Sequence, residues 1–334
     1  MLPVIYGLSG LTLTDDERAF FRDSDPLGYI LFKRNIGDRA QLRALTDSLR
    51  TLSGRDDVPI LIDQEGGKVA RMTPPEWPAF PTGARFAERY DEAPASAIEA
   101  ARANAHAIAL TLAEVGINVN CLPLLDIRQP DTTPAVADRT LGGDPMRVAA
   151  LGRAVIEGLA MGGVLGVMKH VPGHGRAVVD SHHELPVVRA DADALAADIA
   201  PFRTLAPLAP MAMTAHVVFE AWDAANPATL SATVIEQVIR GAIGYDGLLM
   251  TDDIDMKALS GTAGEKAARA IAAGCDVVLD CWARMDEMVE IAGRLSPMGA
   301  QGHARLDRAM AMRRPAETAS LDGLLARRDA LMAA

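Results

Sequence analysis

The stretch VLGVMKH at residues 164–170 is an apolar run that ends in two basic side chains. A run this short and this apolar is typical of a strand buried on both faces, as in a parallel sheet. Seven other runs have the same character, and a helical pattern follows each of them. They are VIYGL (4–8), YILF (29–32), PILID (59–63), NVNCLPLLD (118–126), PMAMTAH (210–216), LLMTD (248–252) and DVVLD (276–280).

Eight alternating strand and helix units predict an α/β fold, a single-domain (β/α)8 TIM barrel over residues 1–334 with extra C-terminal helices. Thr14 with Glu17, and Thr262 with Glu265, have the spacing of a capping box and predict two helix starts. A doubly wound open sheet is the alternative. No GxGxxG sequence follows the first strand, where a dinucleotide-binding fold would place it, so we favour the closed barrel and expect no cofactor.

The amino-acid composition of the chain disfavours some classes of binding partner. The formal charge of −11 and an aromatic content of 4% disfavour nucleic acid, whose phosphates would be repelled and whose bases need stacking platforms. The three cysteines form no CxxC pair, and no apolar run approaches the roughly 20 residues that span a membrane. No basic segment precedes the apolar N-terminal residues. We therefore expect a cytoplasmic protein without nucleic-acid or membrane partners. We also expect a monomer, although nothing in the composition decides the oligomeric state.

Polar side chains at the ends of the third to seventh predicted strands are candidates for chemistry. In a barrel, the C-terminal strand ends form the mouth in which active sites lie, so these side chains are candidates for one pocket. A ring of carboxylates and bases suits a neutral, hydroxyl-rich substrate, whose hydroxyl groups need short charged partners. The residues are Asp63, Asp126, Lys169 with His170, His216 and Asp252.

Residues 173–186 form a segment that is too polar for a strand and too rich in glycine at its start for a helix. We predict a mobile loop that carries Asp180, Ser181 and His182. A carboxylate two residues before a histidine is close enough to fix the imidazole tautomer and to stabilise its cation. Histidine changes charge near neutral pH, so His182 is a candidate acid and base. His183 is interpreted as a neighbour of His182 without a catalytic role of its own.

Asp252 ends the seventh predicted strand, and Asp253 follows it directly. Successive strand residues point to opposite faces, so one of the two carboxylates should face the barrel mouth while the other supports the loop. An ionised carboxylate there can attack or shield an oxocarbenium-like centre.

Two other classes of protein remain as alternatives. A metal-dependent barrel hydrolase would use His170 and His216, but the first strand has no His-x-His and the eighth ends in Asp280 beside Cys281, so ligands would be lacking. We therefore expect no metal. A catalytically silent sugar-binding protein would tolerate the loss of Asp252 or His182, and both are present.

Several motifs together resemble glycoside hydrolase family 3. They are KHVPGHG (169–175), DSH (180–182), LP (185–186) and TDDIDM (251–256), with IDQEGG (62–67) and the pair Asp138–Arg139 fitting the same pattern. The resemblance extends from about residue 1 to at least residue 285. It is strongest to the bacterial cytoplasmic β-N-acetylglucosaminidases of peptidoglycan recycling. Val171, His183 and Ile254 with Asp255 depart from the usual pattern and affect the expected details of substrate fit.

The resemblance implies a retaining exo-β-N-acetylglucosaminidase that acts on small carbohydrate substrates, namely muropeptide fragments that contain N-acetylglucosamine (GlcNAc) linked to 1,6-anhydro-N-acetylmuramic acid (anhydro-MurNAc). Asp252 would be the nucleophile, and His182 with Asp180 the acid/base dyad. The terminal sugar would be bound by Asp63, Arg71, Arg139, Lys169 and His170. A phosphorylase is the alternative within the family, because a histidine acid/base does not repel an incoming phosphate as a carboxylate would.

Overall fold

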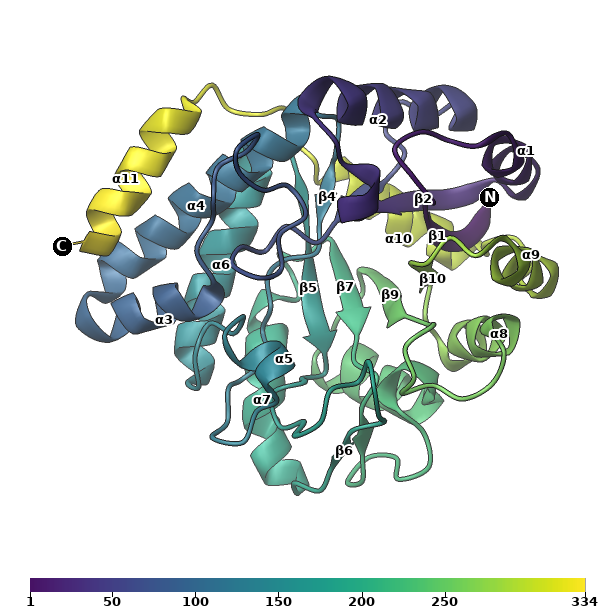
Figure 1. Ribbon diagram of the computed structural model, residues 1–334. Coiled ribbons are helices and arrows are strands. Elements are labelled where there is room, and N and C mark those ends of the chain that lie inside the picture. Colours follow the sequence, from purple (N-terminus) through teal and green to yellow (C-terminus); the bar gives the residue numbers. More distant parts are fainter. Residues whose placement is uncertain (334) are drawn as a thin grey trace.

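The computed structural model describes residues 1–333, and a closed barrel of eight parallel strands forms its centre (Figure 1). Each strand pairs with its neighbours in chain order, and the last closes the ring on the first. The predicted TIM barrel and its eight strands are therefore confirmed. The strands are β1 (Leu2–Gly7), β2 (Pro26–Leu31), β3 (Ile60–Ile62), β4 (Val119–Asn120), β5 (Leu165–Val171), β7 (Met211–Thr214), β9 (Leu248–Asp253) and β10 (Val277–Asp280).

Helices surround the barrel and cover its outer face (Figure 1). Both expected capping boxes are present, at Thr14 before the first helix and at Thr262 before the helix that begins at Ala263. The helices are α1 (Asp15–Ser24), α2 (Arg39–Ser53), α3 (Gly83–Glu92), α4 (Pro94–Glu114), α5 (Pro134–Ala137), α6 (Pro145–Met161), α7 (Ala192–Leu205), α8 (Ala263–Ala273), α9 (Met285–Arg294), α10 (Ala300–Ala311) and α11 (Leu321–Ala333). Short 3-10 turns η1 (Lys33–Asn35) and η2 (Ala228–Leu230) and the π-helical segment η3 (Val234–Ala242) complete the set. None of the helices within residues 1–333 is both long and apolar enough to cross a membrane.

Strand β4 is much shorter than the sequence predicts. We expected a strand over residues 118–126, but only Val119–Asn120 pairs regularly with both neighbours. Pro123 has no N–H to donate, so the hydrogen-bond ladder cannot continue through it. The chain nevertheless stays beside β5, where the Leu125 N–H donates to the Lys169 carbonyl at 2.7 Å. This course carries Asp126 to the base of the barrel mouth.

The core has two layers, which follow from the alternation of side chains along each strand. On β9, Leu248 and Met250 belong to the apolar cluster that fills the barrel, whereas Leu249 packs toward the helices. Asp252 continues the inward series of Leu248 and Met250. The sequence expectation that one of the paired aspartates faces the mouth therefore follows from the register of β9.

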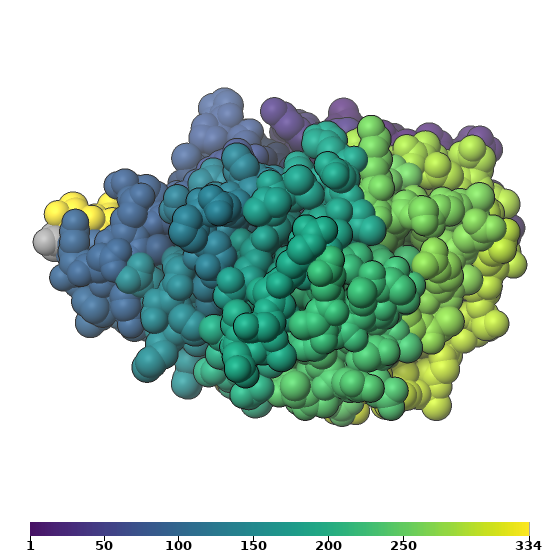
Figure 2. All heavy atoms as spheres, turned by 90° about the horizontal axis from the view of Figure 1, so that it is seen from below, coloured from purple at the N-terminus to yellow at the C-terminus, as the bar shows by residue number. Residues whose placement is uncertain are grey.

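A short parallel pair that the sequence did not predict, β6 (Val187–Val188) with β8 (Val218–Phe219), lies beyond the lower ends of β5 and β7 in Figure 1. Viewed from below, teal and green segments spread over the middle of this face (Figure 2). Strand β6 lies in the connection that follows β5, and β8 lies in the connection that follows β7, so their pairing holds the two connections together. The first connection contains Asp180 and His182.

Candidate active site

A cavity of about 390 Å³ opens at the C-terminal ends of the barrel strands. Every residue to which the family resemblance assigns a catalytic or substrate-binding role lines this one cavity. These residues are Asp63, Arg71, Arg139, Lys169, His170, Asp180, His182 and Asp252. The structure thus brings together residues that lie up to 189 positions apart in the chain, from Asp63 to Asp252.

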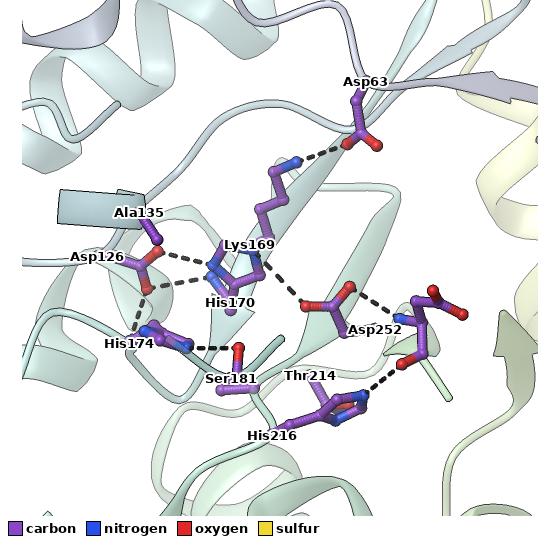
Figure 3. Close-up of polar contacts among 12 residues, drawn as sticks. Asp63, Asp126, Ala135, Lys169, His170, His174, Ser181, Thr214, His216 and Asp252 are labelled. Carbon is purple, nitrogen blue, oxygen red and sulfur yellow. Dashed lines mark hydrogen bonds and ion pairs between the residues drawn. The ribbon is translucent and has the colours of Figure 1, made fainter. Parts of the chain in front are cut away.

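Asp252 projects from the end of β9 into the cavity. Its Oδ1 accepts a hydrogen bond from the Asp253 N–H at 2.8 Å, and its Oδ2 lies 3.9 Å from Nε2 of His170 (Figure 3). Burial alone would raise the pKa of Asp252, but His170, His216 and the Asp253 N–H together hold that pKa below its ordinary value. The carboxylate is therefore ionised at neutral pH.

Asp253 has a different environment. Its Oδ1 accepts hydrogen bonds from the N–H groups of Asp255 and Cys281, both at 3.3 Å, so its carboxyl connects the end of β9 to the end of β10. Burial and the neighbouring charge of Asp252 raise the pKa of Asp253 to about 6. Both aspartates line the cavity, but they differ in environment: Asp252 is an anion there, whereas the carboxyl of Asp253 also accepts backbone hydrogen bonds that brace the loop.

A buried hydrogen-bonded chain lies behind the cavity wall (Figure 3). Oδ2 of Asp126 lies 2.8 Å from Nδ1 of His170, and Oδ1 accepts from the His174 N–H at 2.7 Å. Although burial raises the pKa of Asp126, its contacts with His170 and His174 lower it to about 2. An ionised Asp126 can only accept, so Nδ1 of His170 carries the proton and Nε2 faces Asp252. Asp126 therefore positions His170 and does not itself line the cavity.

His216, the other strand-end candidate, also lies outside the cavity lining. Its Nδ1 is 2.7 Å from the Thr229 hydroxyl and its Nε2 is 2.9 Å from the Asp253 carbonyl oxygen. Burial lowers its pKa, which favours the neutral ring. Both ring nitrogens thus have partners within the protein, and His216 supports the turn at Asp253.

Five charged side chains form a row of ion pairs along one wall. Lys169 Nζ lies 2.8 Å from Asp63 and 2.7 Å from Glu65; Arg71 pairs with Asp63 at 3.3 Å, and Arg139 donates two bonds to Glu65 at 2.7 and 2.8 Å. Burial by itself disfavours the charged forms, but the contacts outweigh it: the pKa of Asp63 falls and that of Lys169 rises. The row remains ionised and has one excess positive charge.

Sequence reasoning missed Glu65, which stands inside the quoted IDQEGG segment. It follows Asp63 by two residues and so lies on the same face of the extended chain, a spacing that could have indicated it. Its pKa is lowered because Arg139 and Lys169 outweigh the effect of burial.

The loop after β5 presents His182 at the cavity edge. Nδ1 of His182 lies 2.7 Å from Oδ1 of Asp180, and the His182 N–H donates to the same oxygen at 3.0 Å. These bonds outweigh the effect of burial and lower the pKa of Asp180. The hydroxyl of Ser181 lies 3.2 Å from Nε2 of His174, which connects the loop to the buried chain behind the wall. His183 does not line the cavity.

A metal site would have to be built on His170 and His216, and both have the hydrogen bonds just described. Within residues 1–333, no group of three or more His, Cys, Asp or Glu side chains is arranged to hold a metal ion.

An anion that faces the cavity, an exposed imidazole with a carboxylate partner, and a row of charged groups that can bind hydroxyls together suit the cleavage of a sugar acetal. The comparison with known families agrees. Residues 10–311 match the model described as the glycosyl hydrolase family 3 N terminal domain. The chain belongs to glycosyl hydrolase family 3.

Relatives of this glycosidase share most of their length with it. A protein named beta-hexosaminidase from Bordetella avium (strain 197N) is 37% identical over 299 residues, which cover 88% of this chain and 84% of the relative. NagZ from Neisseria gonorrhoeae, solved in complex with N-trifluoroacetyl-D-glucosamine, is 30% identical with a TM-score of 0.88, covering 99% of this chain and 97% of that protein.

A family 3 beta-N-acetylglucosaminidase from Paenibacillus sp. str. FPU-7 is 34% identical with a TM-score of 0.82. The comparison covers 99% of this chain but 62% of that protein, so this family 3 glycosidase corresponds to part of the longer enzyme. The family expected from the motifs is confirmed, and with it the class of enzyme.

Proposed function

We propose that this glycosidase is a retaining exo-β-N-acetylglucosaminidase. The observation that carries the proposal is that Asp252, an anion, and His182, paired with Asp180, line the same cavity. The beta-hexosaminidase named in Bordetella avium and the glucosamine derivative bound by NagZ from Neisseria gonorrhoeae support GlcNAc as the terminal sugar.

The proposed reaction has two displacements. A carboxylate oxygen of Asp252 forms a bond to the anomeric carbon while the glycosidic bond breaks, and the imidazolium of His182 gives its proton to the leaving oxygen. The neutral His182 then takes a proton from water, whose oxygen displaces Asp252 and restores the free enzyme. Asp180 keeps Nδ1 of His182 protonated, so Nε2 is the nitrogen that exchanges the proton.

The row of ion pairs would bind the terminal sugar. Lys169, Arg71 and Arg139 offer donors, and Asp63 offers a carboxylate that accepts from sugar hydroxyls. His170 stands between this row and Asp252, held by Asp126. Charges that already have partners can bind a neutral sugar without leaving an unpaired ion in the empty cavity.

For the natural substrate we propose muropeptide fragments in which GlcNAc is linked to anhydro-MurNAc, hydrolysed in the cytoplasm during peptidoglycan recycling. Support comes from the combined KHVPGHG, DSH and TDDIDM motifs. Incubation with the defined disaccharide tests this substrate: release of free GlcNAc supports it. An enzyme that cleaves aryl GlcNAc glycosides but not the disaccharide would contradict it.

A phosphorylase is a second candidate because the acid/base in this cavity is a histidine. An incoming phosphate meets no carboxylate at that position, apart from Asp180 behind the ring. Product analysis with and without phosphate separates the two reactions. GlcNAc as the product in both conditions supports hydrolysis. GlcNAc 1-phosphate, formed only when phosphate is added, would show that the enzyme is a phosphorylase instead.

The covalent step has its own test. A fluorinated GlcNAc donor with a good leaving group should leave a sugar on the protein, and peptide mapping should place it on Asp252. The rival route uses the substrate's acetamide oxygen as the nucleophile. Unlabelled enzyme, together with strong inhibition by a bicyclic thiazoline that mimics the acetamide-derived intermediate, would favour that route instead.

A further inference from the structure

Trp282 presents a large aromatic surface at the active-site cavity. It lies two residues after β10, and its side chain is 54% exposed while lining the same cavity as Asp252 and His182. The catalytic scheme above gives this side chain no role. An exposed indole on the wall of a sugar-binding cavity therefore requires an explanation.

The backbone that holds Trp282 is fixed. The Cys281 N–H donates to Asp253 at 3.3 Å, and the Cys281 carbonyl accepts from the guanidinium of Arg34. Gly7 packs so tightly here that a Cβ would lie 2.2 Å from the Cys281 oxygen. Trp282 thus follows directly after a backbone position that is anchored at Cys281.

Arg34 is the second unexplained group. Within residues 1–333, no carboxylate lies within 4.0 Å of its guanidinium, in contrast to Arg71, Arg139 and Lys169. It donates to the carbonyls of Leu8, at 2.7 Å, and Cys281, which uses two of its five N–H groups. Donors of a permanent cation therefore remain for an anion that enters the cavity.

The exposed fractions of the lining side chains divide the cavity into a buried inner part and an exposed outer part. The side chain of Lys169 is 2% exposed on the inner wall, whereas His182 is 62% exposed at the edge, beside the place where the leaving oxygen must be protonated. The terminal sugar fits the buried part, and the leaving group fits the exposed part. Trp282 belongs to the exposed part by the same criterion.

We propose that Trp282 and Arg34 form the aglycone subsite, where the indole stacks on the face of the leaving sugar and the guanidinium pairs with the carboxylate of an anhydro-MurNAc that carries no peptide. The inference rests on the proposed function and deepens it, because it names the residues that select an acidic aglycone. Aromatic surface contributes through its large contact area, and a guanidinium binds a carboxylate through charge-assisted hydrogen bonds.

The test compares three substrates that share a terminal GlcNAc. They are the disaccharide with anhydro-MurNAc, the same disaccharide with its carboxyl group converted to an amide, and methyl β-N-acetylglucosaminide, whose aglycone has no ring. The readout is the ratio of kcat/KM between two substrates, which does not depend on the concentration of folded enzyme. A variant that folds poorly therefore still gives a valid result.

Trp282→Ala should lower the ratio of the amidated disaccharide to the methyl glycoside about tenfold, in line with a lost aromatic contact. Arg34→Gln should lower the ratio of the acid to the amide about tenfold, as expected for a lost charge-assisted bond, and Arg34→Lys should restore part of it. Val289→Ala is the matched control, because Val289 is 53% exposed but does not line the cavity.

Unchanged ratios in both variants would overturn the subsite while leaving the proposed function intact. A wild-type enzyme that cleaves none of the three glycosides would instead contradict the proposed function.

Discussion

Asp280 offers a quantitative test of the electrostatics beneath the active site. Its side chain is 1% exposed, its Oδ2 has no hydrogen-bond partner within residues 1–333, and burial together with Asp253 raises its pKa from 3.8 to about 7. The folded protein therefore keeps a proton that the unfolded chain loses above about pH 4. Stability from this group is fully present below that pH and is lost as the pH rises to about 7.

The free energy at stake is about 3 pKa units at roughly 1.4 kcal/mol each, or about 4 kcal/mol, an upper value because local relaxation reduces it. Asp280→Asn removes the titration. The unfolding free energy of the variant minus that of the wild type should rise by about 4 kcal/mol from pH 4 to pH 8. Urea unfolding at both pH values measures this. Any fixed cost of burying the amide is the same at both pH values and cancels.

Asp56→Asn, in the exposed loop between α2 and β3, controls for the loss of one formal charge. Equal changes in unfolding free energy for the wild type and Asp280→Asn over this pH range would refute the argument. The buried carboxyl would then be no more basic than an ordinary aspartate.

The other predictions concern the proposed chemistry. Asp252→Ala should abolish turnover of an aryl GlcNAc glycoside, whereas Asp253→Ala should be less severe; equal losses would mean that the nucleophile is misassigned. His182→Ala should slow cleavage of a disaccharide by about 10²- to 10⁴-fold but spare the glycosylation step for an acidic phenol leaving group, and equal losses on both would argue against an acid role. Asp180→Asn should reduce the rate less than His182→Ala does, and wild-type activity at every pH would remove Asp180 from the mechanism.

The fold could be predicted because buried parallel strands leave short apolar runs that differ plainly from helical patterns. Pro123 shows the limit, because it ends regular pairing inside a run that still looks apolar throughout. The short pair β6 and β8 was missed because two residues per strand leave no periodicity to detect.

The candidate site could be predicted only in part. A polar residue at the end of a strand does not always face the mouth: Asp252 faces the cavity, whereas His216 hydrogen-bonds to the protein behind it. The direction depends on strand register, which pairing with distant segments sets. Trp282 was missed because we considered only polar strand ends, although it lies just past such an end.

The row of ion pairs has a consequence for how the enzyme responds to ionic strength. Dissolved ions screen exposed charges over about 8 Å at physiological salt, but they screen buried pairs such as Lys169 with Glu65 far less. The affinity for the neutral terminal sugar should therefore change little as salt is added. Arg34 has no carboxylate partner within residues 1–333, so attraction of an acidic leaving group there should weaken with salt. The two halves of one cavity would then respond differently to the same change of medium, and added salt would make the enzyme less selective for acidic substrates without making it a weaker binder of GlcNAc.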